Sequence, residues 1–404
     1  MKSSEINILL VCSKYMPEYS GAGFRAHNLY KRLIKKYSSL KLSVLCGAET
    51  ENSSSEYEYD GFKVRRVANK PYPSLSSSLL KYFQIGVNFR SEYREALKFM
   101  NTIEPVPDII HVFGKNYVTV AALNFASSKK IPALIELVCE MDTPYQYVPF
   151  PDRFLIKGIF PPVYKTVCIS EKLQETCLSH GIKKENIWCR PNPVNEEIFH
   201  PIEEKIRNEY RSKNTKFGSE DILISYIAKF RPSKNHDFLI DVMKKLPDEF
   251  KLFLKGPLVD SGPLKERDKK LYKGLGRKIK EYKLEERIEL QSGFSDNIHE
   301  LYGMADVYAF PSTQEGLGTP VLESLSCGVP VVANNIPGVT DTMIDDGRNG
   351  FICNLDCGEF AEKIKTASTF STEQKKAEAE KVIRSAGTEV LDGEYFSIIE
   401  KLMN

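Results

Sequence analysis

The sequence lacks the features that place a chain in a membrane or in an export pathway. No apolar run is long enough to span a bilayer, and the start MKSSEINILLVCSKY does not have the layout of a signal peptide. A net charge of +2 argues against a nucleic-acid partner held by bulk charge. Internal repeats and low-complexity tracts are also missing. We therefore expect a globular cytoplasmic protein.

The cysteines lack the spacing of a metal site or of a disulfide framework. They number nine, an odd total, and no two of them form a CxxC pair. Cys353 and Cys357 are the closest two, and no histidine lies near them in the sequence. We interpret the cysteines as reduced thiols, and we expect no metal and no cofactor.

The sequence does contain a regular alternation of apolar runs and helical patterns, and its 404 residues suffice for two domains. Runs such as Ile6–Cys12 and Ile222–Ala228 are typical of parallel strands covered on both faces. The pattern starts again at Ile222, after a charged stretch without apolar period. Between two early strands, SSEYEYD at 54–60 indicates a surface turn. We predict a first domain over 1–198, a linker over 199–219, a second domain over 220–380 and a terminal segment over 381–404.

The stretch from Phe310 to Gly350 has the most specific pattern of the chain. A buried strand ends at Phe310, and Thr319-Pro320 has the form of a helix start, a capping hydroxyl followed by proline. Free amides at a helix start attract anions, phosphate above all. Glu315 and Glu323 flank this start and suit hydrogen bonds from sugar hydroxyls. The pattern favours a ligand with central phosphates and sugars at both ends, and the alternative is a strand–turn–helix with two solvated glutamates.

Glu315 and Glu323, with seven residues between them and GVPVVA after them, resemble the E-x7-E signature of retaining glycosyltransferases of the glycogen-synthase-like family, glycosyltransferase family 4. The resemblance implies an α/β chain of GT-B architecture, in which two Rossmann-like doubly wound domains face each other across a cleft. It also implies a last helix that crosses back to the first domain. Glu315 would contact the donor sugar, and Glu323 the ribose of the nucleotide. The loop amides expected to meet the donor are those of Gly316, Leu317, Gly318 and Thr319.

A second loop adds positive charge. The segment Lys229–Asn235 resembles the family's G-R-x4-K-G motif, with Ala228 and Lys229 in place of glycine and arginine and with Lys234 retained. Two lysines can neutralise a leaving diphosphate without a metal, although a pair of solvated lysines is the alternative. The predicted catalytic residues are Glu315, Lys234 and Lys229.

Two further segments are expected to touch the donor. Ser292, Gly293 and Phe294 resemble the region in which the family holds the nucleotide base through backbone groups. Gly21 and Gly23 lie in a predicted loop between the first strand and a helix, where bare backbone can approach a ligand. This loop is not a GxGxxG motif, which argues against a dinucleotide oxidoreductase.

The acceptor side departs from the family pattern. Many members carry a histidine shortly after the strand that ends here at Leu137, whereas this chain continues as VCEMD. Arg153–Lys165 mixes basic, aromatic and apolar residues, which suits a membrane surface, but a buried connecting segment is the favoured alternative. The acceptor-side candidates are Arg25, His111, Glu136, Glu140 and Asp142. For Arg25, a solvated position on a helix is an equally good interpretation.

These observations favour a retaining glycosyltransferase that transfers a sugar from a nucleotide-diphosphate donor to an acceptor hydroxyl. The expected donor is a UDP- or GDP-sugar. The expected acceptor is a sugar, a glycolipid or a glycan, in polysaccharide, glycolipid or glycoconjugate synthesis. We expect no nucleic-acid partner, and any membrane contact would be peripheral, at the inner face. The alternatives are a catalytically silent nucleotide-sugar-binding protein and another GT-B enzyme, such as a phosphorylase or an epimerase.

Overall fold

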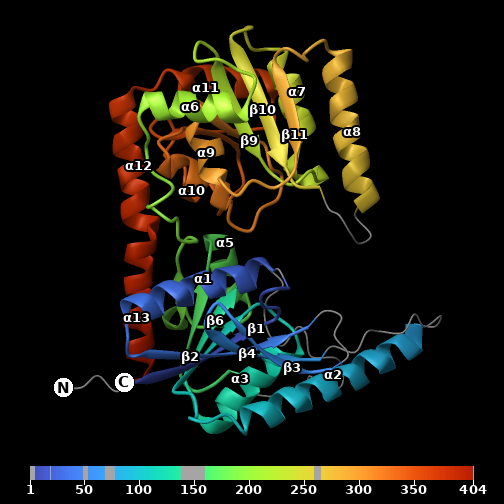
Figure 1. Cartoon of the computed structure of the whole chain (residues 1–404), viewed down its shortest axis with the longest axis vertical. Coiled ribbons are helices and arrows are strands. Elements are labelled where there is room, and N and C mark those ends of the chain that lie inside the picture. The colour runs from blue at the N-terminus through green and yellow to red at the C-terminus, as the bar shows by residue number, and fades with distance from the viewer. Residues whose placement is uncertain are drawn as a thin grey trace. The chain divides into compact units, whose positions relative to one another are not determined.

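The chain folds into two compact units, each built around one β-sheet (Figure 1). Unit 1 comprises Met1–Arg190 and Asp392–Asn404, and unit 2 comprises Pro191–Leu391. The computed structural model describes residues 5–18, 20–48, 53–68, 78–137, 160–258 and 265–403.

Unit 1 has an eight-stranded sheet made of β1 (Ile6–Cys12), β2 (Leu40–Gly47), β3 (Ser55–Tyr59), β4 (Phe62–Val67), β5 (Ile109–Phe113), β6 (Ala133–Leu137), β7 (Tyr164–Cys168) and β8 (Ile187–Cys189). Their order is β3-β4-β2-β1-β5-β6-β7-β8. β3 and β4 pair antiparallel, and the other neighbours pair in parallel. Every residue of β1 except Asn7 is buried, as its continuous apolar run predicts for a strand covered on both faces.

The prediction of a surface turn over 54–60 is wrong, because the edge strand β3 lies within this range. Glu56 and Glu58 are exposed, and the residues between and beside them are partly buried. This two-residue alternation is a strand signal, but its buried positions hold serine and tyrosine instead of aliphatic residues. Exposed glutamates suit an edge strand, since they discourage pairing with another chain.

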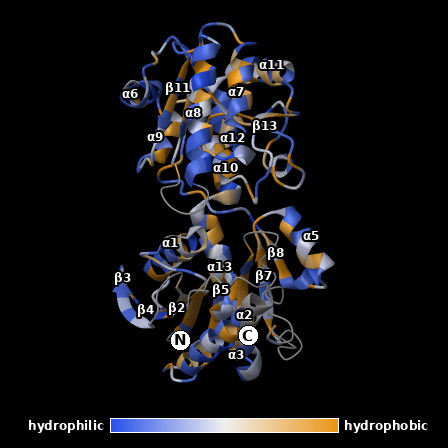
Figure 2. Cartoon of the chain, turned by 90° about the vertical axis from the view of Figure 1, so that its right-hand side faces the viewer, coloured by the Kyte–Doolittle hydropathy of each residue, from blue (hydrophilic) through white to orange (hydrophobic). Residues whose placement is uncertain are grey.

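Unit 2 has a six-stranded, fully parallel sheet made of β9 (Ile222–Ile227), β10 (Phe250–Gly256), β11 (Ile288–Ser292), β12 (Val307–Phe310), β13 (Val331–Asn334) and β14 (Gly350–Cys353). The order is β11-β10-β9-β12-β13-β14, so the chain leaves β9 on one side and later returns to its other side. The strands are largely hydrophobic (Figure 2). Phe253, Tyr308 and Phe310 lie fully inside.

Helices cover the faces of both sheets. None of the helices in the described residues has the length and apolarity that a bilayer crossing requires. Unit 1 holds α1 (Gly21–Lys36), α2 (Ser78–Met100), α3 (Tyr117–Lys129) and α5 (Glu171–Ser179). Unit 2 holds α6 (Glu204–Asn214), α7 (His236–Met243), α8 (Lys265–Glu281), α9 (Ile298–Gly303), α10 (Thr319–Ser326), α11 (Cys357–Ser368) and α12 (Thr372–Ala386). The last helix, α13 (Thr388–Met403), starts in unit 2 and from Asp392 on belongs to unit 1.

The charged stretch 199–219, which the sequence predicts as a linker, contains helix α6 and lies inside unit 2. Arg211 is the buried residue that fastens this helix. Its guanidinium donates to the Met304 carbonyl at 2.9 Å and to the Asp221 carbonyl at 2.8 Å. It also pairs with Asp306 at 2.9 Å. The apolar period is weak here because a charged side chain, and not an aliphatic one, anchors the helix.

Candidate functional site

The site in unit 2 begins where the strand order reverses. β9 and β12 are parallel neighbours, and the loops after their carboxyl ends therefore emerge side by side. In open α/β sheets this reversal point leaves a crevice in which ligands bind. Lys229 and Lys234 lie in the loop after β9, and Glu315 lies in the loop after β12. The structure thus brings together the residues that the sequence predicts to be catalytic.

Tyr226, next to the last residue of β9, contacts both the loop after β9 and the loop after β12. Its buried hydroxyl donates to the Lys234 carbonyl at 2.7 Å and lies 3.0 Å from the Ser312 hydroxyl. The same two loops are also joined by a backbone hydrogen bond, in which the Thr313 amide donates to the Ser233 carbonyl at 2.9 Å. Tyr226 was not predicted, because its run ILISYIA has the pattern of an ordinary buried strand.

Lys234 and Glu315 form an ion pair between the two loops. Their side chains are 22% and 11% exposed, so both remain reachable from one side. Loss of hydration, together with the nearby charges of Arg231 and Lys234, lowers the pKa of Lys229. The cluster therefore carries excess positive charge, which suits an anion. Among the described residues, no three histidine, cysteine or acidic side chains come together as a metal-binding group.

Helix α10 has its amino end at the same edge of the sheet, after β12, but its cap differs from the predicted one. Gly318 is the N-cap, with φ 78° and ψ 41°, and Thr319 is the first helical residue. A left-handed N-cap suits glycine, which has no Cβ to strain. The Thr319 hydroxyl accepts instead from the Asn192 amide at 3.0 Å. Since no side chain caps this helix, its positive end is available to an anion.

Glu323 lies in the second turn of α10 and is partly buried. Desolvation raises its pKa to about 7, although a hydrogen bond from the Tyr302 hydroxyl acts in the opposite direction. Burial also raises the pKa of Tyr302, so this phenol stays a donor. Glu323 is thus a hydrogen-bond acceptor that protonates near neutral pH. Tyr302 was missed, because nothing in the sequence connects it to a residue on another helix.

The predicted base-binding residues lie at the end of β11 and directly after it, at the same edge of the sheet. Gly293 has φ 124°, and its amide donates to the Gly256 carbonyl at the end of β10 at 3.0 Å. Phe294 next to it is 78% exposed, an unusual position for a large apolar side chain. A flat exposed ring at a strand-end loop can stack on a nucleobase. Ser292 is exposed beside it.

In unit 1, the glycines predicted to lie in a loop form the first turn of α1, which begins at Gly21. Ser20 caps this helix by accepting from the Gly23 amide. A Cβ on Gly23 would lie 2.4 Å from the Lys14 carbonyl oxygen, so glycine lets the helix approach the loop after β1. The loop prediction is therefore wrong for Gly21 and Gly23, because the serine ahead of them acts as the cap.

His111 and Glu136 are buried in a network of polar side chains in unit 1. Arg190 donates to Glu136 at 3.0 Å, and the Tyr395 hydroxyl donates to it at 2.5 Å. Burial alone would raise the pKa of Glu136, but Arg190 and His111 hold it below its usual value. Both candidates are about 1% exposed, so this network closes them off from an acceptor. Arg25 lies partly exposed on α1 and adds to the positive charge around Glu136.

Other acceptor-side predictions fall elsewhere. Glu140 and Asp142 lie outside the described residues, as does most of Arg153–Lys165. A pocket of about 310 Å³ opens at the carboxyl ends of β1 and β2, and Lys14 and Lys115 are among the residues that line it. This pocket was not predicted, although Lys115 and Asn116 shortly after β5 were a signal for it.

The comparisons with known proteins agree with this geometry. Residues 207–382 match the family model described as glycosyl transferases group 1. The matched segment comprises 176 of the 404 residues. It contains Lys229, Lys234, Glu315 and Glu323, and it lies within unit 2.

The relatives and solved structures extend the likeness along the chain. Over 276 residues the chain is 25% identical to sulfoquinovosyl transferase SQD2 of Arabidopsis thaliana, covering 64% of this chain and 49% of that one. The chain thus spans about half the length of this relative. It is also 25% identical over 348 residues to an uncharacterized glycosyltransferase of Methanocaldococcus jannaschii, covering 85% of this chain and 83% of that one.

Among solved structures, Alr3699/HepE of Anabaena in complex with UDP is similar with a TM-score of 0.70 and 16% identity. That alignment covers 98% of this chain and 100% of the other. The GT-B fold predicted from the glutamate motif is confirmed, and so is the resemblance to GT-B glycosyltransferases. The narrower assignment to glycosyltransferase family 4 stays a prediction.

Proposed function

We propose that the protein transfers a sugar from a nucleotide-diphosphate donor to an acceptor hydroxyl, with retention of configuration and without a metal. One observation carries the proposal: the Lys234–Glu315 pair lies beside an uncapped helix start at the reversal point of the sheet. This arrangement offers positive charge, free amides and carboxylates to one ligand. A sugar nucleotide has the matching order of groups.

The mechanism follows from where charge develops. As the bond between the anomeric carbon and the diphosphate oxygen breaks, its electron pair moves to the diphosphate. Lys229, Lys234 and the amides at the start of α10 would stabilise that charge, and fixed donors of this kind supply large rate enhancements. Glu315 would orient the sugar, and Glu323 would accept from the ribose. Phe294 would flank the base.

The donor is proposed to be a UDP- or GDP-sugar, and the structure solved with UDP supports the former. The acceptor is proposed to be a sugar, a glycolipid or a glycan, as in the synthesis of a polysaccharide or a glycoconjugate. The test is release of free nucleoside diphosphate from UDP-, GDP- and ADP-sugars, with a chelator present and no acceptor. Slow hydrolysis of one donor, lost in Lys234→Ala, supports the proposal. No release and no calorimetric binding from any donor contradicts it.

A silent nucleotide-sugar-binding protein is the second candidate. The burial of His111 and Glu136 favours it, because these side chains cannot assist an acceptor while their network is intact. Such a protein would bind one donor in calorimetry, yet release no nucleoside diphosphate even when simple sugars or glycolipids are offered as acceptors. Turnover with any acceptor would exclude it.

A further inference from the structure

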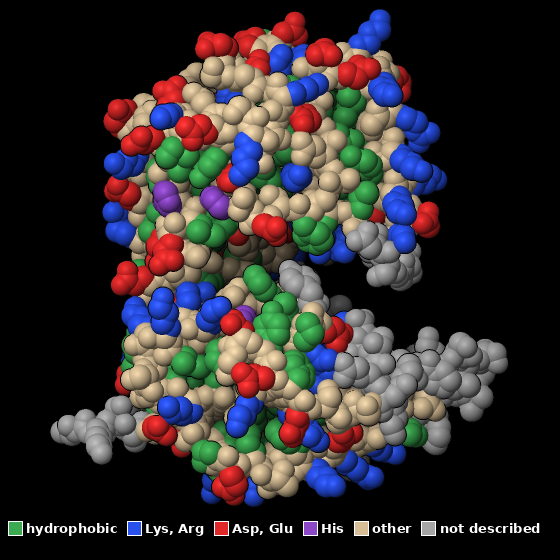
Figure 3. Space-filling view, in the orientation of Figure 1, with side chains coloured by type: hydrophobic (Ala, Val, Ile, Leu, Met, Phe, Trp, Pro, Cys, Tyr) green, Lys and Arg blue, Asp and Glu red, His purple; other side chains and the backbone are tan. Residues whose placement is uncertain are grey.

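One face of α8 carries positive charge that the proposed reaction does not use. The helix has eight basic and three acidic residues, a net charge of +5, whereas the whole chain carries +2. The rest of the chain is therefore net negative, at −3. In Figure 3, Lys and Arg side chains follow one another along the edge of unit 2 where α8 lies. The helix is mostly hydrophilic when viewed from that side in Figure 2.

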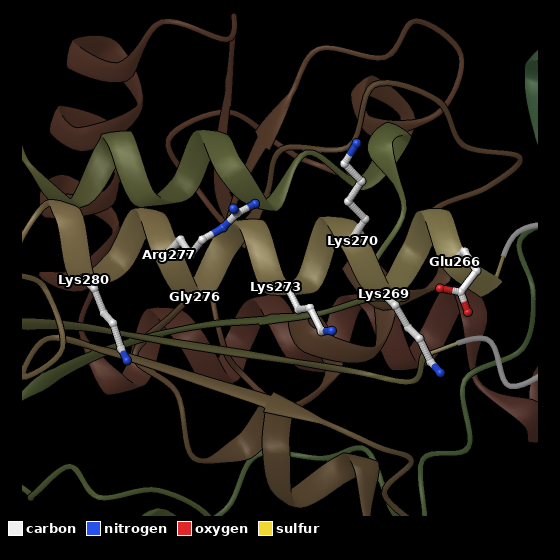
Figure 4. Close-up of a pocket in the computed structure, with 7 residues that line it drawn as sticks. All are labelled: Glu266, Lys269, Lys270, Lys273, Gly276, Arg277 and Lys280. Carbon is white, nitrogen blue, oxygen red and sulfur yellow. The ribbon is translucent and has the colours of Figure 1, made fainter.

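Five of these side chains form what we call the basic face. The helical repeat places all five within about a third of the helix circumference, and Figure 4 shows Lys269, Lys273 and Lys280 along one edge of this face and Lys270 and Arg277 along the other. With Glu266 and Gly276 they line an open hollow of about 720 Å³. From the first to the last of them the face is about 16 Å long, given the rise of an α-helix. It is therefore broad enough to meet an extended surface.

The basic face is not explained by folding. Two other basic residues of α8 do have acidic partners: Arg267 pairs with Asp268, and Lys278 pairs with Asp237 and Asp241. Within the described part of the chain, the five side chains of the basic face make no such ion pair. Like charges three and four residues apart destabilise a helix, and so does glycine. Nothing lies within 4 Å of the Cβ positions of Gly274 and Gly276, so packing does not require glycine at either.

We propose that the basic face of α8 binds an anionic lipid surface. Clusters of four to eight basic residues on one helix face attract such surfaces electrostatically. Four of the five residues are lysines, and lysine is depleted in protein–protein interfaces. Recognition of individual phosphates, as in nucleic acids, favours the bidentate arginine fork. Of the described residues of α8, none is an exposed large hydrophobic, so the contact is electrostatic and not insertive. The inference does not rest on the proposed reaction.

The experiment is co-sedimentation of the full chain with phosphatidylcholine vesicles that contain or lack phosphatidylglycerol. The test variant is Lys270→Gln with Lys273→Gln and Lys280→Gln, all exposed. The matched control is Lys205→Gln with Lys376→Gln and Lys381→Gln, which removes the same charge from exposed positions on α6 and α12. Figure 1 places α12 on the opposite side of unit 2 from α8. Circular dichroism establishes that the variants are folded.

We expect binding to the phosphatidylglycerol vesicles alone, and its loss at high salt. Each basic residue contributes about fivefold to such binding, so the test variant should bind about a hundredfold more weakly while the control retains its affinity. Equal binding to both vesicle types, no binding to either, or an equal loss in the control would overturn the proposal. A folded test variant that binds vesicles normally would do the same. Tight binding of single-stranded DNA without vesicle binding would assign the face to nucleic acid instead.

Discussion

At the scale of single residues, Glu323 should make the binding of the nucleotide depend on pH. If the ribose hydroxyls donate to this side chain, the ligand prefers the carboxylate, and the pKa of about 7 sets where it forms. Affinity for the nucleoside diphosphate should then fall by up to about tenfold for each pH unit below 7. Calorimetric titrations between mildly acidic and mildly basic pH check this. Glu323→Gln should leave only the titration of the ligand's own phosphate.

The same residue should lower stability above neutral pH. Its pKa in the folded chain, about 7, lies above the ordinary value of 4.5, so the folded state opposes ionisation. The resulting destabilisation is absent below the ordinary pKa, grows as pH rises toward 7 and is constant above it. Glu323→Gln should therefore increase the free energy of unfolding at alkaline pH, by about 3 kcal/mol at most. Urea unfolding at acidic pH should show no such gain, and a gain there would contradict the assignment.

Lys234 should act on turnover more than on binding. A lysine that stabilises charge developed in the transition state affects the rate, and removal of such a donor costs about 10²–10³ in kcat. For Lys234→Ala we expect this loss with less than about a tenfold change in affinity for the nucleoside diphosphate. Lys213→Ala is the matched control, because Lys213 also pairs with a glutamate, Glu300, at 2.7 Å. Equal effects of the two variants would refute the role.

At this scale the sequence identifies residues whose spacing along the chain is informative. Glu315, Glu323 and Lys234 are of this kind, since strand ends and a helix start bracket them. Tyr226 and Tyr302 could not be found, because both look like ordinary core tyrosines and their polar contacts form only in the folded chain. Burial of Glu136 by Arg190 and Tyr395 was likewise invisible, since it depends on a contact that spans 259 positions.

At the scale of elements, the start of α1 offers a matched pair of glycines. A Cβ on Gly23 would approach the Lys14 carbonyl to 2.4 Å, whereas nothing lies within 4 Å of one on Gly21. We expect Gly23→Ala to destabilise unit 1 by about 1–3 kcal/mol through overpacking. Gly21→Ala should be neutral or should stabilise by up to about 1 kcal/mol. Urea unfolding followed by tryptophan fluorescence measures both. If Gly21→Ala destabilised unit 1 more than Gly23→Ala, the close approach of the start of α1 to the Lys14 carbonyl would not be needed for stability.

Most strands were predictable because their apolar runs are continuous, and most helices because their patterns are periodic. Two of the failures share a physical cause, which is a polar residue in a structural position. Arg211 anchors α6 in the stretch predicted as a linker, and alternating tyrosines and glutamates make β3. The cap of α10 belongs to Gly318 and not to Thr319, because backbone conformation decides the cap and the sequence does not show it.

At the scale of the whole molecule, the single tryptophan makes the two units separable in an unfolding experiment. Trp188 lies in unit 1, with its ring centroid 4.7 Å from that of Tyr395 on α13. Its fluorescence therefore reports unit 1, whereas far-ultraviolet circular dichroism reports both units. A ligand that binds unit 2 should shift the circular dichroism transition more than the fluorescence transition.

Tyr395→Ala should act on unit 1, and therefore on the fluorescence transition. The ring is 1% exposed in the core of unit 1, and its hydroxyl bonds Glu136, so truncation leaves a cavity and an unpaired polar group. We expect the free energy of unfolding that fluorescence reports for unit 1 to fall by about 3–5 kcal/mol. The part of the circular dichroism signal that comes from unit 2 should unfold as before. Tyr302→Ala is the counterpart in unit 2, where an equally buried ring should affect only the dichroism. If both variants move both transitions together, the units unfold as one cooperative body, and α13 couples their stabilities.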